Sequence, residues 1–145
     1  MRKTFVMRGQ TASGETEILN FSGYKPGYAY RLTEFEIFPS TGFPQTDEMA
    51  ATITAGKTAV TPTDPNFNDD GLIGSTVLQM HTTYHSLNQL TIINDTFLIT
   101  QNLILMVINT STGTPINWQC RFESVKMSGP EEAAVNFKQF SISDE

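Results

Sequence analysis

Two histidines, His81 and His85, are the first residues in this 145-residue sequence whose spacing suggests metal chemistry. In a β-strand, residues four apart lie on the same face, so both imidazoles point the same way. Two histidines supply half of a four-ligand zinc site. The sequence places no third ligand beside them, and the pair falls where an apolar run gives way to a polar loop. We therefore expect loop or surface histidines and no metal.

The segment Asp64–Gly71 is rich in oxygen ligands and invites comparison with a calcium loop. The EF-hand pattern needs glycine at its sixth position and a carboxylate at its twelfth. Asp69 and Ser75 occupy those positions. Turn formation explains Asp, Asn, Pro and Gly equally well. A turn is the prediction, and a hard cation bound in the loop is the alternative.

Neither nucleophilic nor acid–base catalysis has a recognisable set of residues. Cys120 alternates with Trp118 and Phe122, which predicts a buried and unreactive thiol. Glu34 and Glu36 share one face of a predicted strand and are interpreted as an exposed acidic strip. The sequence predicts no catalytic residues and no cofactor, so we expect a protein that is not an enzyme.

The charge balance limits the partners of the chain. A formal net charge of −6 argues against broad nucleic-acid binding, which needs a basic surface. Positive charge gathers only at the start, in Arg2, Lys3 and Arg8. These residues either aid solubility or dock on an acidic partner surface. The longest apolar run, 103–108, is far too short to span a bilayer, so we expect no membrane contact.

Residue usage favours sheets. The chain holds 20 threonines, 10 phenylalanines and 4 tyrosines, types that suit pleated strands. Short apolar runs bounded by turn residues recur along one domain, 1–145. The runs are 3–8, 15–21, 28–38, 49–55, 72–82, 89–94, 97–109 and 116–127. Their number and spacing predict an antiparallel β-sandwich, preferably a jelly roll, with immunoglobulin-like topology as the alternative.

Three details sharpen this prediction. The apolar phase of 28–38 changes near Thr33, which indicates a bulge or a strand that changes sheets. The long segment 58–71 is interpreted as a crossover between sheets, and 109–115 as a hairpin loop. The run 103–108 is apolar on both faces, which indicates either a central strand or a strand whose outer face meets another subunit. The predicted cover of that second face is a neighbouring subunit, and the alternative is the C-terminal helix.

The C-terminal segment 129–145 changes pattern. Pro130 with Glu131 and Glu132 after it is typical of a helix start. Ala133, Ala134, Phe137 and Phe140 then predict one short amphipathic helix, followed by an acidic tail. Phe137 and Phe140, with the basic N-terminal residues, are the predicted partner contacts.

Three stretches carry a resemblance to a known group of proteins. They are the basic start 1–9, the segment 27–39 and the loop 64–71 that leads into a strand. In these the chain resembles small β-rich virion proteins of marine tailed bacteriophages. The resemblance implies a jelly-roll homotrimer that decorates or cements a capsid, with the major capsid protein or another virion protein as its partner. It also implies location in the virion, after assembly in the host cytoplasm.

The resemblance leaves other roles open. The chain is too short for the usual major capsid protein of tailed phages, but a small jelly-roll coat subunit stays an alternative. A second alternative is a virion module that binds carbohydrate or the host through loops at one end of the sandwich. Exposed aromatic side chains mark such loops, and the candidates are Tyr24, Phe43, Phe67 and Tyr84.

Overall fold

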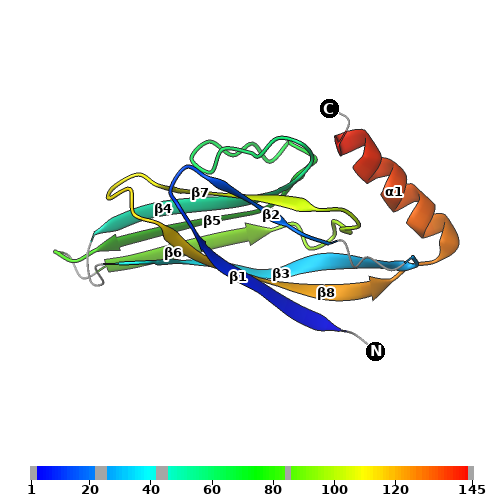
Figure 1. Ribbon diagram of the computed structural model, residues 1–145, viewed down its shortest axis with the longest axis horizontal. Coiled ribbons are helices and arrows are strands. Elements are labelled where there is room, and N and C mark those ends of the chain that lie inside the picture. The colour runs from blue at the N-terminus through cyan, green and yellow to red at the C-terminus, as the bar shows by residue number, and fades with distance from the viewer. Residues whose placement is uncertain (1–2, 22–25, 42–45, 84–85, 144–145) are drawn as a thin grey trace.

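The computed structural model describes residues 3–21, 26–41, 46–83 and 86–143, which form two packed antiparallel sheets and one C-terminal helix (Figure 1). The all-β sandwich predicted from the sequence is confirmed. The strands are β1 (Thr4–Thr11), β2 (Thr16–Leu19), β3 (Tyr28–Pro39), β4 (Asp47–Ala55), β5 (Leu72–His81), β6 (Ser86–Ile93), β7 (Leu103–Asn109) and β8 (Ile116–Lys126). The helix α1 spans Gly129–Ser143.

The order of the strands is that of a jelly roll with one strand displaced. One sheet has the order β1-β8-β3, and the other has the order β2-β7-β4-β5-β6. A regular eight-stranded jelly roll has sheets of order 1-8-3-6 and 2-7-4-5. Here β6 remains hydrogen-bonded to β5 along its whole length and does not join β3. The displacement leaves β6 at the edge of the larger sheet.

Two connections differ from the sequence prediction. The segment 56–71 joins β4 to β5, which are neighbours in one sheet, so it is not a crossover between sheets. The segment 110–115 joins β7 to β8, which lie in different sheets, so it is not a hairpin loop. Periodicity identifies strands but not their partners, which explains both errors.

Other boundaries follow the sequence closely. The register between β3 and β8 shifts between Leu32 and Glu34, which confirms the bulge predicted near Thr33. The alternative, a strand that changes sheets, is wrong, because β3 pairs with β8 on both sides of that bulge. The predicted run 97–109 is only half strand, because Ile99 makes an isolated bridge to Tyr30 before β7 begins.

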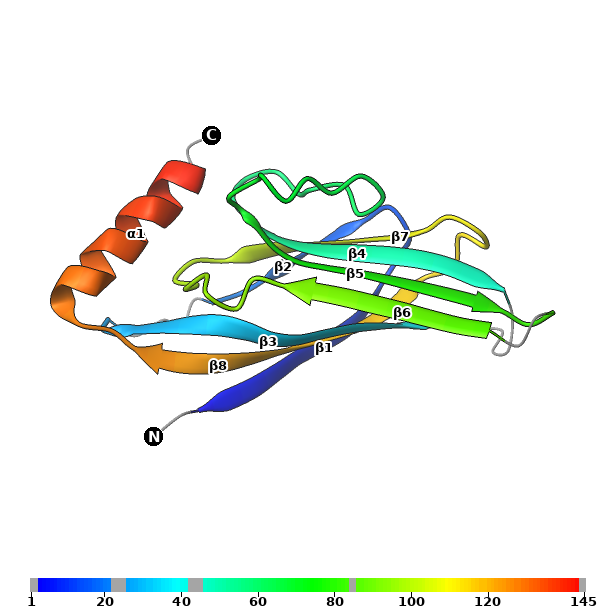
Figure 2. The ribbon, with the colours of Figure 1, turned by 180° about the vertical axis from the view of Figure 1, so that it is seen from behind.

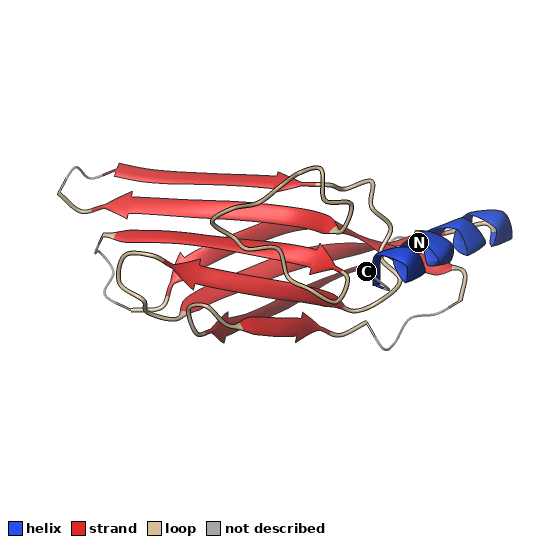
Figure 3. Cartoon of the chain, turned by 90° about the horizontal axis from the view of Figure 1, so that it is seen from above, coloured by secondary structure: helices blue, strands red, loops and turns tan. Residues whose placement is uncertain are grey.

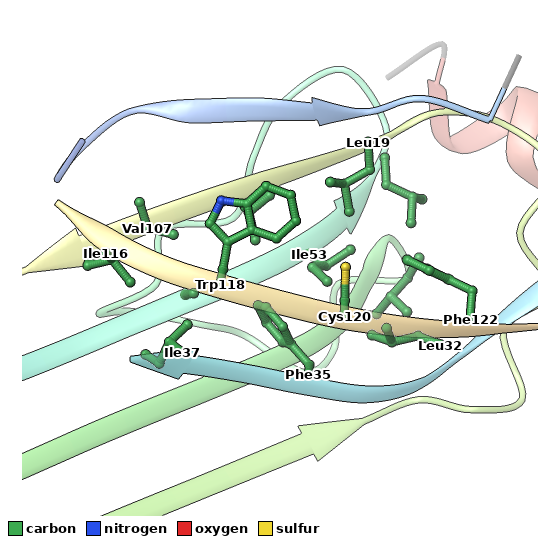
Figure 4. Packing of buried hydrophobic residues seen from close by; sticks show 14 of the residues in the cluster. Leu19, Leu32, Phe35, Ile37, Ile53, Val107, Ile116, Trp118, Cys120 and Phe122 are labelled. Atoms are coloured by element: carbon green, nitrogen blue, oxygen red, sulfur yellow. The ribbon is translucent and has the colours of Figure 1, made fainter. Parts of the chain in front are cut away.

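The core lies between the sheets and is built around β8. Trp118, Cys120 and Phe122 all point inward and are buried, as their alternation predicts (Figure 4). They meet Leu32 and Phe35 of β3. Phe122 also packs edge-on against Phe21 and is stacked with Phe5. The two sheets are therefore held together by one continuous apolar cluster.

Helix α1 begins at a capping residue and lies at one end of the sandwich (Figure 2). The hydroxyl of Ser128 accepts a hydrogen bond from the Glu131 N–H, which satisfies one of the free donors in the first turn. The prediction that the apolar face of this helix is its buried face is wrong. Ala133, Ala134 and Phe137 are exposed, whereas the polar Gln139 is buried.

Candidate interaction surface

The two histidines do not form a metal site among the described residues. His81 ends β5 half-buried, with its Nε2 3.9 Å from Glu48 Oε1. His85 lies outside the described residues. In the part of the chain that the structure describes, no three His, Cys, Asp or Glu side chains gather closely enough to hold a metal ion.

The loop 64–71 shows the side-chain-to-backbone bonding of turns. Asn66 Oδ1 accepts a hydrogen bond of 3.0 Å from the Asn68 N–H. Asp69 Oδ1 accepts one of 2.9 Å from the Gly71 N–H. These bonds bear out the turn prediction, because the side chains replace backbone partners two residues on.

Cys120 and Glu34 also behave as the sequence predicts. Burial raises the pKa of the Cys120 thiol to about 12, and a backbone hydrogen bond with Met7 lowers it only in part. The thiol therefore stays protonated at neutral pH and is a poor nucleophile. Glu34 is exposed and accepts a hydrogen bond of 3.2 Å from Arg121 Nε, and Glu36 is exposed beside it.

The predicted partner contacts are not brought together into one site. Lys3 is exposed just before β1, and Arg8 is exposed within β1. Arg2 lies outside the described residues. Phe137 is 74% exposed on α1. Phe140 lies in α1, and its side chain is outside the described set. The described members of this set therefore lie on two separate parts of the chain, residues 3–8 and the helix α1.

The structure instead reveals an apolar surface on the outer face of the larger sheet. Strand β7 alternates as predicted: Leu103, Leu105 and Val107 are buried in the core, and the residues between them face outward and are half-buried. The register carries this outer face across neighbouring strands, since Met106 lies opposite Thr52 of β4 and Thr52 lies opposite Ser75 of β5.

The segment 56–71 covers only the middle of this face. The Thr52 hydroxyl donates to the Val60 carbonyl at 2.6 Å, and Thr54 Oγ1 accepts from the Val60 N–H at 3.3 Å. Thr52 and Thr54 are consequently buried. Figure 3, seen from above, shows this loop lying over the sheet, with strands uncovered on either side. The second cover predicted for β7 is thus supplied in part by this loop, and α1 reaches only its margin through Ile142 near Gly56.

Two apolar patches remain outside the loop. The β2–β7 patch consists of Ile18, Ile104, Met106 and Ile108. The β5–β6 patch consists of Val77, Leu90 and Ile92. Ile18 is 59% exposed and Leu90 is 62% exposed, so each patch holds a large aliphatic side chain open to solvent. Large uncovered apolar areas on a sheet face are typical of surfaces that bind other proteins.

A second kind of feature lies near the loop 64–71. Phe67 is 60% exposed and lines a hollow of about 270 Å³ together with Asp69, Asp70 and Lys138. Tyr24, Phe43 and Tyr84, the other predicted loop aromatics, lie outside the described residues.

Comparison with known proteins adds no family. No protein-family model and no curated protein matches the sequence. Within the described residues, no helix is long and apolar enough to cross a membrane. The β5–β6 patch was not predicted from the sequence, although one signal was present: the segment 86–94 contains Leu87, Leu90 and Ile92 and no Asp, Glu, Lys or Arg.

Proposed function

We propose that the protein is a non-enzymatic structural subunit of a virion, which decorates or cements a phage capsid as a homo-oligomer. The observation that supports this most directly is the β2–β7 patch, where an apolar strand face remains half-open on a well-packed sandwich. A trimer is the arrangement that the resemblance to phage virion proteins implies. The capsid partner and the virion location come from the same resemblance.

The occupant proposed for the β2–β7 patch is a second copy of the chain. Interfaces between identical subunits are more apolar than ordinary protein surface, and stable ones bury roughly 800 Å² per partner. Ile18, Met106 and Ile108 offer side chains of the type found at their centres. The exposed Lys3 and Arg8 then remain free to contact an acidic site on the shell. Such a contact weakens as salt rises.

Sedimentation velocity of the purified protein, with and without capsids, tests this proposal. We expect an oligomer at micromolar concentration and co-sedimentation with capsids. Ile18→Lys places a charge in the patch and should dissociate the oligomer. Val6→Lys is the matched control, because Val6 is an exposed aliphatic residue on the other sheet. A wild-type protein that stays monomeric and does not bind capsids would contradict the proposal.

A carbohydrate-binding or host-adhesion role is the second candidate, and the hollow beside Phe67 favours it. An exposed aromatic ring next to carboxylates suits a sugar, whose apolar face stacks on the ring while its hydroxyls donate to the acids. Binding to a glycan panel that is lost in Phe67→Ala, with the oligomeric state unchanged, would support this role over the structural one.

A further inference from the structure

Strand β6 forms one lateral edge of the larger sheet and lies open to solvent over most of its length. It pairs with β5 on one side, and no helix or strand of the described residues lies beside its other side, at the top of Figure 3. Thr91 donates from its hydroxyl to the Phe35 carbonyl at 3.1 Å, and this side chain points toward the other sheet. The Thr91 side chain therefore faces β3, but among the described residues no backbone hydrogen bond joins β3 to β6. Glu34 and Glu36 of β3 line a hollow together with Gln89, Thr91 and Ile93 of β6.

The backbone of β6 presents a regular set of free groups along that edge. The Asn94 N–H donates to the Ile73 carbonyl at 2.8 Å, so Asn94 and the even-numbered residues before it bond toward β5. Antiparallel pairing alternates, so Leu87, Gln89, Thr91 and Ile93 direct their N–H and C=O groups outward. An edge of this kind is a template for one further strand.

Charge distinguishes β6 from the other edge strands of the described structure. β1 carries Arg8, β2 carries Glu17, and β3 carries Glu34 and Glu36. Charged residues of this kind protect edges from pairing with other chains. No Asp, Glu, Lys or Arg occurs from Thr82 to Asn94. In a chain of net charge −6, β6 is thus the edge strand of the described structure that adds no charge of its own to a contact between two copies.

We propose that β6 pairs antiparallel with β6 of a second copy about a two-fold axis, which joins the two larger sheets into one continuous sheet. The register that matches apolar side chains puts Leu90 on the axis, opposite Leu90 of the other copy. Leu87, 64% exposed, then lies opposite the partner's Ile93, and Gln89 lies opposite the partner's Thr91. This register pairs outward-facing backbone groups with each other throughout.

The neighbouring register is less favourable. With Gln89 on the axis, Leu90 lies opposite Asn88 and Leu87 lies opposite Thr91, so each exposed leucine meets a polar side chain. Cross-strand apolar pairs stabilise antiparallel sheets more than such mixed pairs. An edge of eight residues with a small apolar patch is at the low end of specific interfaces, so we expect micromolar affinity. The contact goes beyond the proposed function, since it requires neither the β2–β7 patch nor a capsid. In an assembly of trimers it would link neighbouring oligomers.

Disulfide trapping at β6 tests both the contact and its register. The only native cysteine is buried, so an introduced thiol reacts alone. Leu90→Cys puts two thiols on the axis, at the close spacing of a non-hydrogen-bonded pair. Asn88→Cys is the matched control on the same face of the strand. In the proposed register its two copies lie four residues apart along the strand, about 13 Å, beyond the reach of a disulfide.

We expect Leu90→Cys to form a covalent dimer under mild oxidation at least about tenfold faster than Asn88→Cys. Equal rates for the two variants would overturn the register, because residues 88 and 90 are equidistant from an axis at Gln89. If Leu90→Cys forms no disulfide-linked dimer under oxidation, the contact itself is overturned. Neither result bears on capsid binding, which is measured separately.

A second variant tests the contact without cysteine. Gln89→Pro removes an N–H that faces outward and is unused within the subunit, so the fold tolerates it at an edge. The concentration-dependent doubling of mass in sedimentation should disappear in Gln89→Pro. It should persist in the control Phe67→Lys, which changes an exposed residue outside β6. Doubling that survives Gln89→Pro would contradict edge pairing.

Discussion

The indole N–H of Trp118 donates a hydrogen bond of 2.9 Å to the hydroxyl of Thr11, and both side chains are buried. The bond ties the end of β1 to the start of the neighbouring strand β8, on the inner face of the smaller sheet. Thr11→Val keeps the shape of the side chain and leaves the indole N–H without this partner. We expect a loss of about 1–3 kcal/mol in the free energy of unfolding, measured in urea. Thr4→Val, at an exposed position of the same strand, should change little.

Removal of the indole itself has a larger expected effect. Trp118→Ala leaves a cavity beside Phe35 and Val107 in the core, so we expect a loss of about 3–5 kcal/mol in the same urea measurement. A loss below about 1 kcal/mol would mean that the side chain contributes little to the packing between the sheets.

Two glycines at and just before the start of β5 should differ in how much stability an alanine substitution costs. A Cβ at Gly71 would lie 2.3 Å from the Ala55 carbonyl oxygen, whereas a Cβ at Gly74 would lie 2.9 Å from Leu32 Cδ2. A backbone atom cannot move aside as a side chain can. We therefore expect Gly74→Ala to cost about 1–3 kcal/mol and Gly71→Ala to cost more. Gly129→Ala has open space around it and should be near neutral in the same thermal or urea melts.

Attachment of α1 depends on a buried polar residue. Gln139 Oε1 accepts a hydrogen bond of 2.9 Å from the Thr100 N–H, and its Nε2 donates to the Leu98 carbonyl. Gln139→Glu removes the donor and places a carboxylate beside a carbonyl oxygen. We expect the amides of α1 to lose hydrogen-exchange protection while those of β8 keep theirs. Asn136→Asp makes the same chemical change at a half-buried site of α1 and should preserve protection.

Local patterns predicted the elements well because their causes are local. The alternation from Ile116 to Glu123 indicates one solvent-facing and one buried face of the strand. The phase change near Thr33 indicates one extra residue in β3 relative to its partner β8. The position of β6 at an edge was not predictable in this way. Its alternation depends on the two faces of the sheet, whereas edge or centre depends on which strand lies alongside.

The buried face of helix α1 was also not predictable from local spacing. The spacing of Ala133 and Phe137 predicts an apolar inner face, but Phe137 is exposed. The helix docks through Gln139 because the segment 98–100 presents unpaired backbone groups, and only a side chain that both donates and accepts can satisfy them. That requirement arises from a segment about 40 residues away in the sequence.

The buried thiol of Cys120 makes stability depend on pH in the alkaline range. Its pKa is about 12 in the folded protein, against an ordinary value of 9.0, because burial disfavours the thiolate. Below pH 9 the thiol is protonated in both states and contributes no pH dependence. Above pH 9 the unfolded chain loses this proton while the folded chain keeps it, so stability falls as pH rises. The fall is at most about 1.4 kcal/mol per pH unit for one proton.

Comparison with Cys120→Ala isolates this effect from tyrosine and lysine titration. We expect the variant to be less stable at pH 8, because it leaves a small cavity beside Phe35 and Phe122. Between pH 9 and pH 10.5 the stability difference should shrink, since only the wild type carries the thiol. Urea unfolding at three pH values in that range measures it. Parallel curves for the two proteins would show that the thiol ionises equally in both states, and would contradict its burial.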